Sequence, residues 1–144
     1  MGKKFMLIGS SQVGKTTLIQ MLKKHDIKYK KTQSVERIEN FIDVPGEYIE
    51  IPHYYRALLV TSYDADMIIL VQGADEEQSM FPPRFASAFN KKAIGVVTKI
   101  DLNEDTTEIE HQLREAGAEK IFRTSSKNES SVDELRDFLI KFNA

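Results

Sequence analysis

One stretch limits the possible folds of this chain more than any other. It is a glycine-bounded loop that follows the apolar run Phe5 to Ile8 and precedes a helical pattern, and it reads Gly9-Ser10-Ser11-Gln12-Val13-Gly14-Lys15-Thr16. The loop matches G-x-x-x-x-G-K-[ST], in the strand-to-helix context that a phosphate-binding loop requires. Its backbone N–H groups would point at phosphate oxygens, and the helix would add its positive dipole end.

Two side chains of this loop carry the expected chemistry. Lys15 would reach the β- and γ-phosphates as a mobile point charge, and the Thr16 hydroxyl would bind the Mg²⁺ that bridges them. The alternative is an ordinary glycine-containing turn with a chance Lys-Thr pair. The residues expected to bind nucleotide here are Gly9, Ser10, Ser11, Gln12, Val13, Gly14, Lys15, Thr16 and Thr17.

Two downstream segments fit the metal-side loops of a nucleotide switch. Thr32 lies in a polar stretch and would supply a hydroxyl to Mg²⁺ and an N–H to the γ-phosphate, although an ordinary loop threonine is an equal alternative. Asp43 begins a D-x-x-G sequence in which it would hold Mg²⁺ through water, while the Gly46 N–H would contact the γ-phosphate. D-x-P-G is also a common turn sequence, but its position downstream of a phosphate loop favours the switch. The predicted metal ligands are Thr16, Thr32 and Asp43.

The tetrapeptide Thr98-Lys99-Ile100-Asp101 fits [NT]-K-x-D, the guanine-reading loop of GTP-binding proteins. Guanine presents two donors that one carboxylate, Asp101, can accept, and adenine presents neither in that arrangement. Lys99 would lay its stem over the base. The segment Thr124, Ser125 and Ser126 would offer a backbone N–H to the guanine O6, although it matches the usual S-A-[KL] loop loosely.

Alternating strand and helix patterns predict the architecture. Met67 to Val71 and Ala93 to Val97 are continuous apolar runs, typical of strands buried on both faces of a parallel sheet. We expect an α/β fold in which helices alternate with the strands of a mostly parallel sheet. Further strands are expected near 5–8 and 119–123, with an edge hairpin near 34–37 and 40–44. Helices are expected near 15–24, 53–63 and 83–90, after a cap at Asn103, and after a Ser131/Glu134 capping box.

Composition excludes several classes of protein. A chain of 144 residues is the size of one domain, so we expect 1–144 to form a single domain. A net charge of −2 gives no reason to expect nucleic-acid binding, and the absence of cysteine excludes disulfides and thiolate metal sites. The longest apolar run is far too short to cross a bilayer. We therefore expect no membrane or nucleic-acid partner, and the lack of cysteine is compatible with a reducing cytosol.

These motifs, in this order, resemble those of the small GTPases of the phosphate-loop class over essentially the whole chain. Four segments narrow the resemblance to the EutP/PduV family of ethanolamine and propanediol utilisation: 31–36, 43–48, 81–86 and 97–101. The resemblance implies an α/β fold of three layers, a P-loop NTPase (Ras-like GTPase) domain with a mostly parallel sheet of about six strands and helices on both faces. It further implies that the domain binds GTP or GDP with Mg²⁺ in a bacterial cytoplasm. It also implies association with a metabolic microcompartment, where a microcompartment protein or an activating factor would be the partner.

One residue departs from the small-GTPase pattern. Glu47 stands where many small GTPases have the glutamine that orients the attacking water, and a carboxylate there adds negative charge to an anionic site. We therefore expect weak hydrolysis, with Glu47 serving the switch conformation together with Arg37 or Arg56. The candidate catalytic residues are Lys15, Thr32, Gly46 and Glu47.

Two other functions stay open. The family has been linked to phosphate transfer onto acetate, so the same loop and Mg²⁺ could serve an ATP-dependent acetate kinase. Asp101 argues against that function because it selects guanine, and no carboxylate-binding arginine pair is evident. The third hypothesis is a non-catalytic assembly factor that binds nucleotide for stability.

Overall fold

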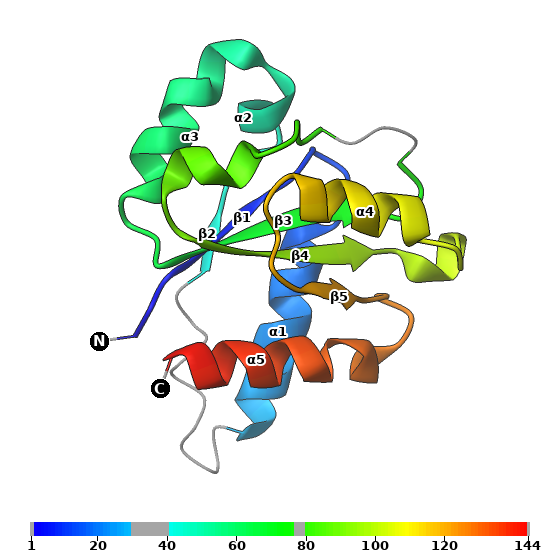
Figure 1. Ribbon diagram of the computed structural model, residues 1–144. Coiled ribbons are helices and arrows are strands. Elements are labelled where there is room, and N and C mark those ends of the chain that lie inside the picture. Colours follow the sequence, from blue (N-terminus) through cyan, green and yellow to red (C-terminus); the bar gives the residue numbers. More distant parts are fainter. Residues whose placement is uncertain (1, 30–40, 77–79, 144) are drawn as a thin grey trace.

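A parallel sheet of five strands forms the centre of the computed structural model, which describes residues 2–29, 41–76 and 80–143 (Figure 1). The strand order is β2-β1-β3-β4-β5, and every neighbouring pair is parallel. The strands are β1 (Phe5–Ile8), β2 (Phe41–Asp43), β3 (Met67–Gly73), β4 (Lys92–Thr98) and β5 (Ile121–Arg123). Since the strands are parallel, their carboxyl ends all lie at one edge of the sheet.

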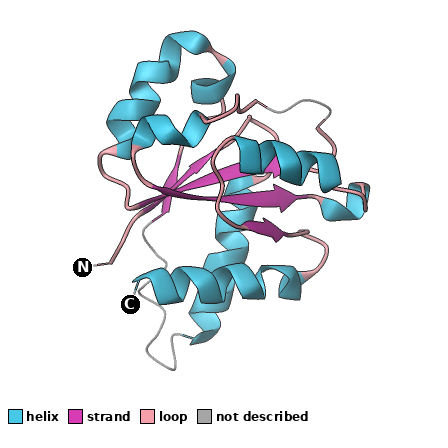
Figure 2. Ribbon diagram, viewed as in Figure 1, coloured by secondary structure: helices cyan, strands magenta, loops and turns pink. Residues whose placement is uncertain are grey.

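Helices cover both faces of this sheet (Figures 1 and 2). On one face lie α1 (Lys15–Tyr29) and α5 (Asp133–Asn143). On the other lie α2 (Glu47–Glu50), α3 (Tyr55–Ser62) and α4 (Thr107–Glu115). Short 3₁₀ helices span Pro52–Tyr54, Phe85–Phe89, Ile100–Leu102 and Glu129–Val132. Among the helices described, none combines the length and apolarity that crossing a bilayer requires.

Side chains alternate across the sheet and build two separate cores. In β1, Phe5 and Leu7 pack toward α1 and α5, whereas Met6 and Ile8 pack toward the opposite helices. This is the period of two that a strand imposes on its side chains. All four are fully buried, which explains why strands covered on both faces read as continuous apolar runs.

The predicted α/β architecture is confirmed, with corrections at the edges. The described residues form five strands, against about six expected, and β2 pairs with β1 in parallel. The hairpin expected between 34–37 and 40–44 stays a prediction. The expected piece at 34–37 lies outside the described residues. Helix α1 runs to Tyr29 instead of Lys24, because no glycine or proline interrupts residues 15–29.

Two predicted helix caps are wrong because the capping side chains have other partners. The Asn103 side-chain oxygen accepts the Asp105 N–H (3.2 Å), its amide donates to the Ala74 carbonyl (3.3 Å), and α4 begins only at Thr107. Ser131 lies inside the 3₁₀ helix Glu129–Val132, where its hydroxyl accepts the Ser125 N–H (2.9 Å), so it forms no capping box with Glu134.

Candidate nucleotide-binding site

The predicted functional segments meet at the carboxyl edge of the sheet. The phosphate loop follows β1, Asp43 ends β2, residues 98–101 end and follow β4, and residues 124–126 follow β5. The register aligns Val97 with Arg123 and Gly73 with Thr98, so these loops leave the sheet at neighbouring positions. This is the edge at which open α/β sheets bind ligands.

The phosphate loop closes around its own lysine. Gly14 has φ +92°, a conformation that side-chain-bearing residues rarely adopt, and α1 begins at the next residue. The buried Lys15 ammonium donates to the carbonyls of Gly9 (2.7 Å) and Ser10 (3.0 Å). Burial lowers the pKa of Lys15, while nearby carboxylates act in the opposite direction. A cation therefore lies over the loop, at the position where phosphate oxygens would bring negative charge.

Two of the three predicted metal ligands lie together. The Thr16 hydroxyl donates to an Asp43 carboxylate oxygen at 2.8 Å, and both side chains are exposed. These hard oxygen donors suit Mg²⁺, which usually takes its other ligands from water and substrate phosphates. Within the described parts of the chain, no group of three or more His, Cys, Asp or Glu residues could hold a metal alone. The third predicted ligand, Thr32, lies outside the described residues.

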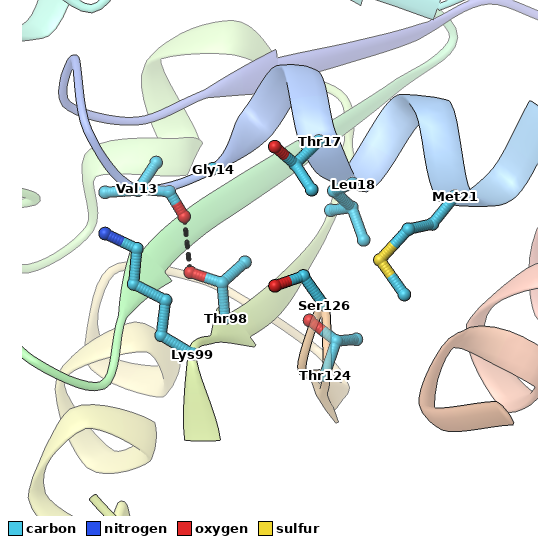
Figure 3. A pocket seen from close by; sticks show the side chains of 9 residues that line it. All are labelled: Val13, Gly14, Thr17, Leu18, Met21, Thr98, Lys99, Thr124 and Ser126. Atoms are coloured by element: carbon cyan, nitrogen blue, oxygen red, sulfur yellow. Dashed lines mark hydrogen bonds between the residues drawn. The ribbon is translucent and has the colours of Figure 1, made fainter. Parts of the chain in front are cut away.

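A pocket joins the phosphate loop to the two loops predicted to bind the base, residues 98–101 and 124–126, which we call the base loops (Figure 3). Its lining combines an apolar wall from the start of α1 with polar side chains from the ends of β4 and β5. The lining residues are Val13, Gly14, Thr17, Leu18, Met21, Thr98, Lys99, Thr124 and Ser126. A flat aromatic base attached to a phosphate chain fits such a lining, because the ring needs apolar contact and the base edges need polar partners.

The first two residues of the T-K-x-D segment tie the base loop to the phosphate loop. The buried Thr98 hydroxyl donates to the Val13 carbonyl (2.5 Å), and the Lys99 ammonium donates to the Gln12 carbonyl (2.5 Å). The Lys99 ammonium also lies 3.6 Å from the Asp75 carboxylate. The stem of Lys99 lines the pocket, and its head group bridges the two loops (Figure 3).

Asp101 is oriented by a residue of the other base loop. The Ser125 hydroxyl donates to one Asp101 carboxylate oxygen at 2.6 Å, and this bond is the main reason that the pKa of Asp101 is lowered. The carboxylate is therefore ionised and fixed, with acceptor capacity remaining on both oxygens.

Two of the three predicted O6 donors already use their N–H groups within the part of the chain that the structure describes. The Thr124 N–H donates to the Val97 carbonyl (2.8 Å) and the Ser125 N–H donates to the Ser131 hydroxyl (2.9 Å). Ser126 lines the pocket, so its N–H is the remaining candidate among the three.

Two glutamates that the sequence analysis missed contact the phosphate loop. The Glu50 carboxylate accepts both the Ser11 N–H and the Ser11 hydroxyl, each at 2.9 Å. The Glu76 carboxylate accepts the Ser10 hydroxyl and the Gly73 N–H, each at 2.8 Å. These glutamates lie 39 and 66 residues from their loop partners, and no motif marks them. The sequence analysis also missed the contact between Ser131 and Ser125, because the residues around Ser131 match the capping-box pattern.

The Gly46 backbone packs directly against the phosphate loop. A Cβ built on Gly46 would lie 2.3 Å from the Ser11 backbone nitrogen, so only glycine fits this approach. Glu47 begins α2, and its side chain lies outside what the structure describes. Arg56 is exposed on α3, and Arg37 falls outside the described residues, so the role of Glu47 stays a prediction.

Comparison of the sequence with known proteins gives a full-length match. The profile of the family described as "Ethanolamine utilisation - propanediol utilisation" matches residues 2–141. Over 139 residues the chain is 43% identical to "Propanediol utilization protein PduV" of Citrobacter freundii, covering 95% of this chain and 93% of that protein. It is 36% identical over 141 residues to "Probable acetate kinase EutP" of Escherichia coli K12, covering 95% and 89%.

Comparison with solved structures supports the fold. The chain resembles translation elongation factor SelB from Methanococcus maripaludis, solved in complex with the GTP analogue GppNHp, with a TM-score of 0.61 and 21% identity. The match covers 97% of this chain and 33% of the elongation factor. At this identity the likeness concerns the fold, which is that of a P-loop GTPase.

Proposed function

This chain belongs to the ethanolamine-utilisation and propanediol-utilisation family, and from that premise we propose that it binds guanine nucleotides and hydrolyses GTP slowly with Mg²⁺. The family supplies the metabolic setting, and the residues at the carboxyl edge of the sheet supply the chemistry. Association with a bacterial microcompartment, and a protein partner or activating factor there, are parts of the same proposal.

The observation that carries this proposal is the Asp101 carboxylate held by the Ser125 hydroxyl at 2.6 Å. That bond fixes the side chain and favours its ionised form, and the carboxylate can still accept the two donors of a guanine edge. An adenine presents neither of these donors in that arrangement, so it would forgo both hydrogen bonds to the carboxylate. Guanine is therefore the base that this arrangement favours.

The phosphate side of the site fits the same ligand. The loop N–H groups and Lys15 would bind the phosphates, and Thr16 and Asp43 would hold Mg²⁺ directly and through water. Mg²⁺ would neutralise charge on the phosphate oxygens as the terminal bond breaks. Glu76 places negative charge beside the loop, which supports slow hydrolysis because that charge opposes an anionic transition state.

A second candidate, phosphate transfer to acetate, is favoured by a neighbouring cavity and by the name of the Escherichia coli relative. The cavity lies beside the phosphate loop and has room for a small acceptor. Its lining includes the carboxylates of Glu50, Asp75 and Glu76, whereas Lys99 is the one cation among the described lining residues and already pairs with Asp75. Such a charge pattern repels acetate, so we place this candidate second.

Product analysis separates the three hypotheses. The purified protein is incubated with Mg²⁺ and either GTP alone or ATP with acetate, and phosphate and acetyl phosphate are measured in both mixtures. Slow phosphate release from GTP that disappears in Lys15→Ala supports the proposal. Acetyl phosphate from ATP and acetate would replace it with the kinase, and tight nucleotide binding without any turnover would leave the assembly factor.

A further inference from the structure

The Glu50 side chain is bound to the phosphate loop as an anionic ligand would be. Its two carboxylate oxygens are used separately, one by the Ser11 N–H and the other by the Ser11 hydroxyl, both at 2.9 Å. A phosphate at such a loop is held by backbone N–H groups of successive residues, and the Glu50 carboxylate takes one such N–H together with the hydroxyl of the same residue. Glu50 therefore occupies donors that a nucleotide phosphate would use.

The charge of Glu50 is maintained by these contacts. The Ser11 N–H and then the Ser11 hydroxyl are the main causes of a lowered pKa for Glu50, and the Lys15 charge acts in the same direction. The carboxylate of Glu50 in turn favours the charged form of Lys15. A phosphate that approaches Lys15 must therefore meet a negative charge already bound to the loop.

The position of α2 indicates which phosphate is affected. Glu50 is held in place by its N–H bond to the Gly46 carbonyl (3.1 Å), and the Gly46 backbone lies directly against Ser11. Gly46 is the residue expected to meet the γ-phosphate, so Glu50 reaches the loop from the γ-phosphate side. A diphosphate would end before this region, whereas a triphosphate would extend into it.

We propose that Glu50 is an internal competitor of the terminal phosphate and sets the preference of this chain for nucleoside diphosphate over triphosphate. The inference rests on the proposed function and deepens it, because it assigns a specificity-determining residue to the same site. Binding of a triphosphate then requires the carboxylate to leave Ser11. This displacement involves the neighbouring helices as well, because Tyr48 of α2 stacks on Tyr54 with ring centroids 5.4 Å apart.

The test compares Glu50→Gln with the matched control Glu108→Gln. Glu50 is exposed, so the variant is expected to fold, and glutamine keeps the side-chain volume while removing the charge. Glu108 is an exposed glutamate on α4, so its replacement makes the same charge change on another helix. Dissociation constants are measured for GDP and GppNHp, and for pyrophosphate and tripolyphosphate, which need no base site.

We expect Glu50→Gln to bind GppNHp and tripolyphosphate about 5- to 10-fold more tightly than the parent protein, because a competing closed state no longer reduces the apparent affinity. GDP and pyrophosphate should change by less than about 2-fold, and Glu108→Gln should change none of the four. Ser11→Ala removes one of the two bonds to Glu50 and should shift the triphosphates in the same direction by less.

Two results would overturn the proposal. One is unchanged or weakened GppNHp binding in Glu50→Gln, and the other is an equal gain for diphosphates and triphosphates. Pyrophosphate and tripolyphosphate separate failure of this proposal from failure of the proposed function, because their binding does not depend on the base. If no form binds guanine nucleotide but Glu50→Gln gains affinity for tripolyphosphate over pyrophosphate, the guanine assignment fails while the competitor role of Glu50 stands.

Discussion

Replacing Asp101 by asparagine tests the assignment of the base loop. The Ser125 hydroxyl donates to one side-chain oxygen of Asp101, and an asparagine would keep that bond by placing its single oxygen there. Its amide NH₂ group would then face the two donors of guanine. Two hydrogen bonds to a charged acceptor are lost, and because this carboxylate is exposed to solvent we expect GDP affinity to fall on the order of 10²-fold.

The assay is competition against a fluorescent guanine nucleotide, with xanthosine diphosphate as the third ligand. Xanthine carries a carbonyl oxygen where guanine carries its exocyclic amine, so the asparagine amide can donate to it. Asp101→Asn should therefore favour xanthosine diphosphate over GDP, whereas the parent protein favours GDP. Asp105→Asn is the matched control, because Asp105 is an exposed carboxylate of the same segment that accepts the Thr107 N–H. Unchanged GDP affinity in Asp101→Asn would refute the assignment.

Three further predictions concern the loops and the core. Ser125→Ala should raise the pKa of Asp101, because the hydrogen bond that favours the ionised carboxylate is lost. As the solution is acidified, GDP binding should therefore be lost at a higher pH in this variant than in the parent protein. Coincident pH titrations of the two proteins would contradict this. Lys99→Met keeps the apolar stem of the side chain but loses the hydrogen bond to the Gln12 carbonyl. Calorimetry should show GDP affinity reduced roughly 3- to 10-fold, and unchanged affinity would contradict this role of Lys99. Leu113→Ala, at a fully buried position, should lower the free energy of unfolding by about 2–5 kcal/mol in urea denaturation, and a loss below 1 kcal/mol would argue against the packing described.

The sequence predicted the central elements well because their signals are local. The runs at 67–71 and 93–97 are apolar without interruption, as strands covered on both faces must be, and β3 and β4 contain them. Likewise a short helix is expected near 83–90, and the 3₁₀ helix Phe85–Phe89 lies there with both of these phenylalanines buried. Such features depend on neighbouring residues, so pattern and turn chemistry are sufficient to find them.

Contacts between distant segments could not be predicted in the same way. Nothing in the local sequence of Glu50 or Glu76 indicates that the folded chain places their carboxylates on Ser11 and Ser10. The same limit explains the wrong caps: Ser131 has the local signature of a capping box, but the fold uses its hydroxyl to support Ser125. Local propensity was overridden wherever a side chain had a tertiary partner.

The central claim is that this site binds guanine nucleotides, and competition binding tests it most directly. The purified protein is titrated with fluorescent GDP, and the bound ligand is displaced by GTP and by ATP, with and without Mg²⁺. The account predicts that GTP displaces the fluorescent ligand at concentrations orders of magnitude below those of ATP, with Mg²⁺ favouring the guanine nucleotides. Equal displacement by ATP would contradict the role of Asp101 and would move the kinase to first place.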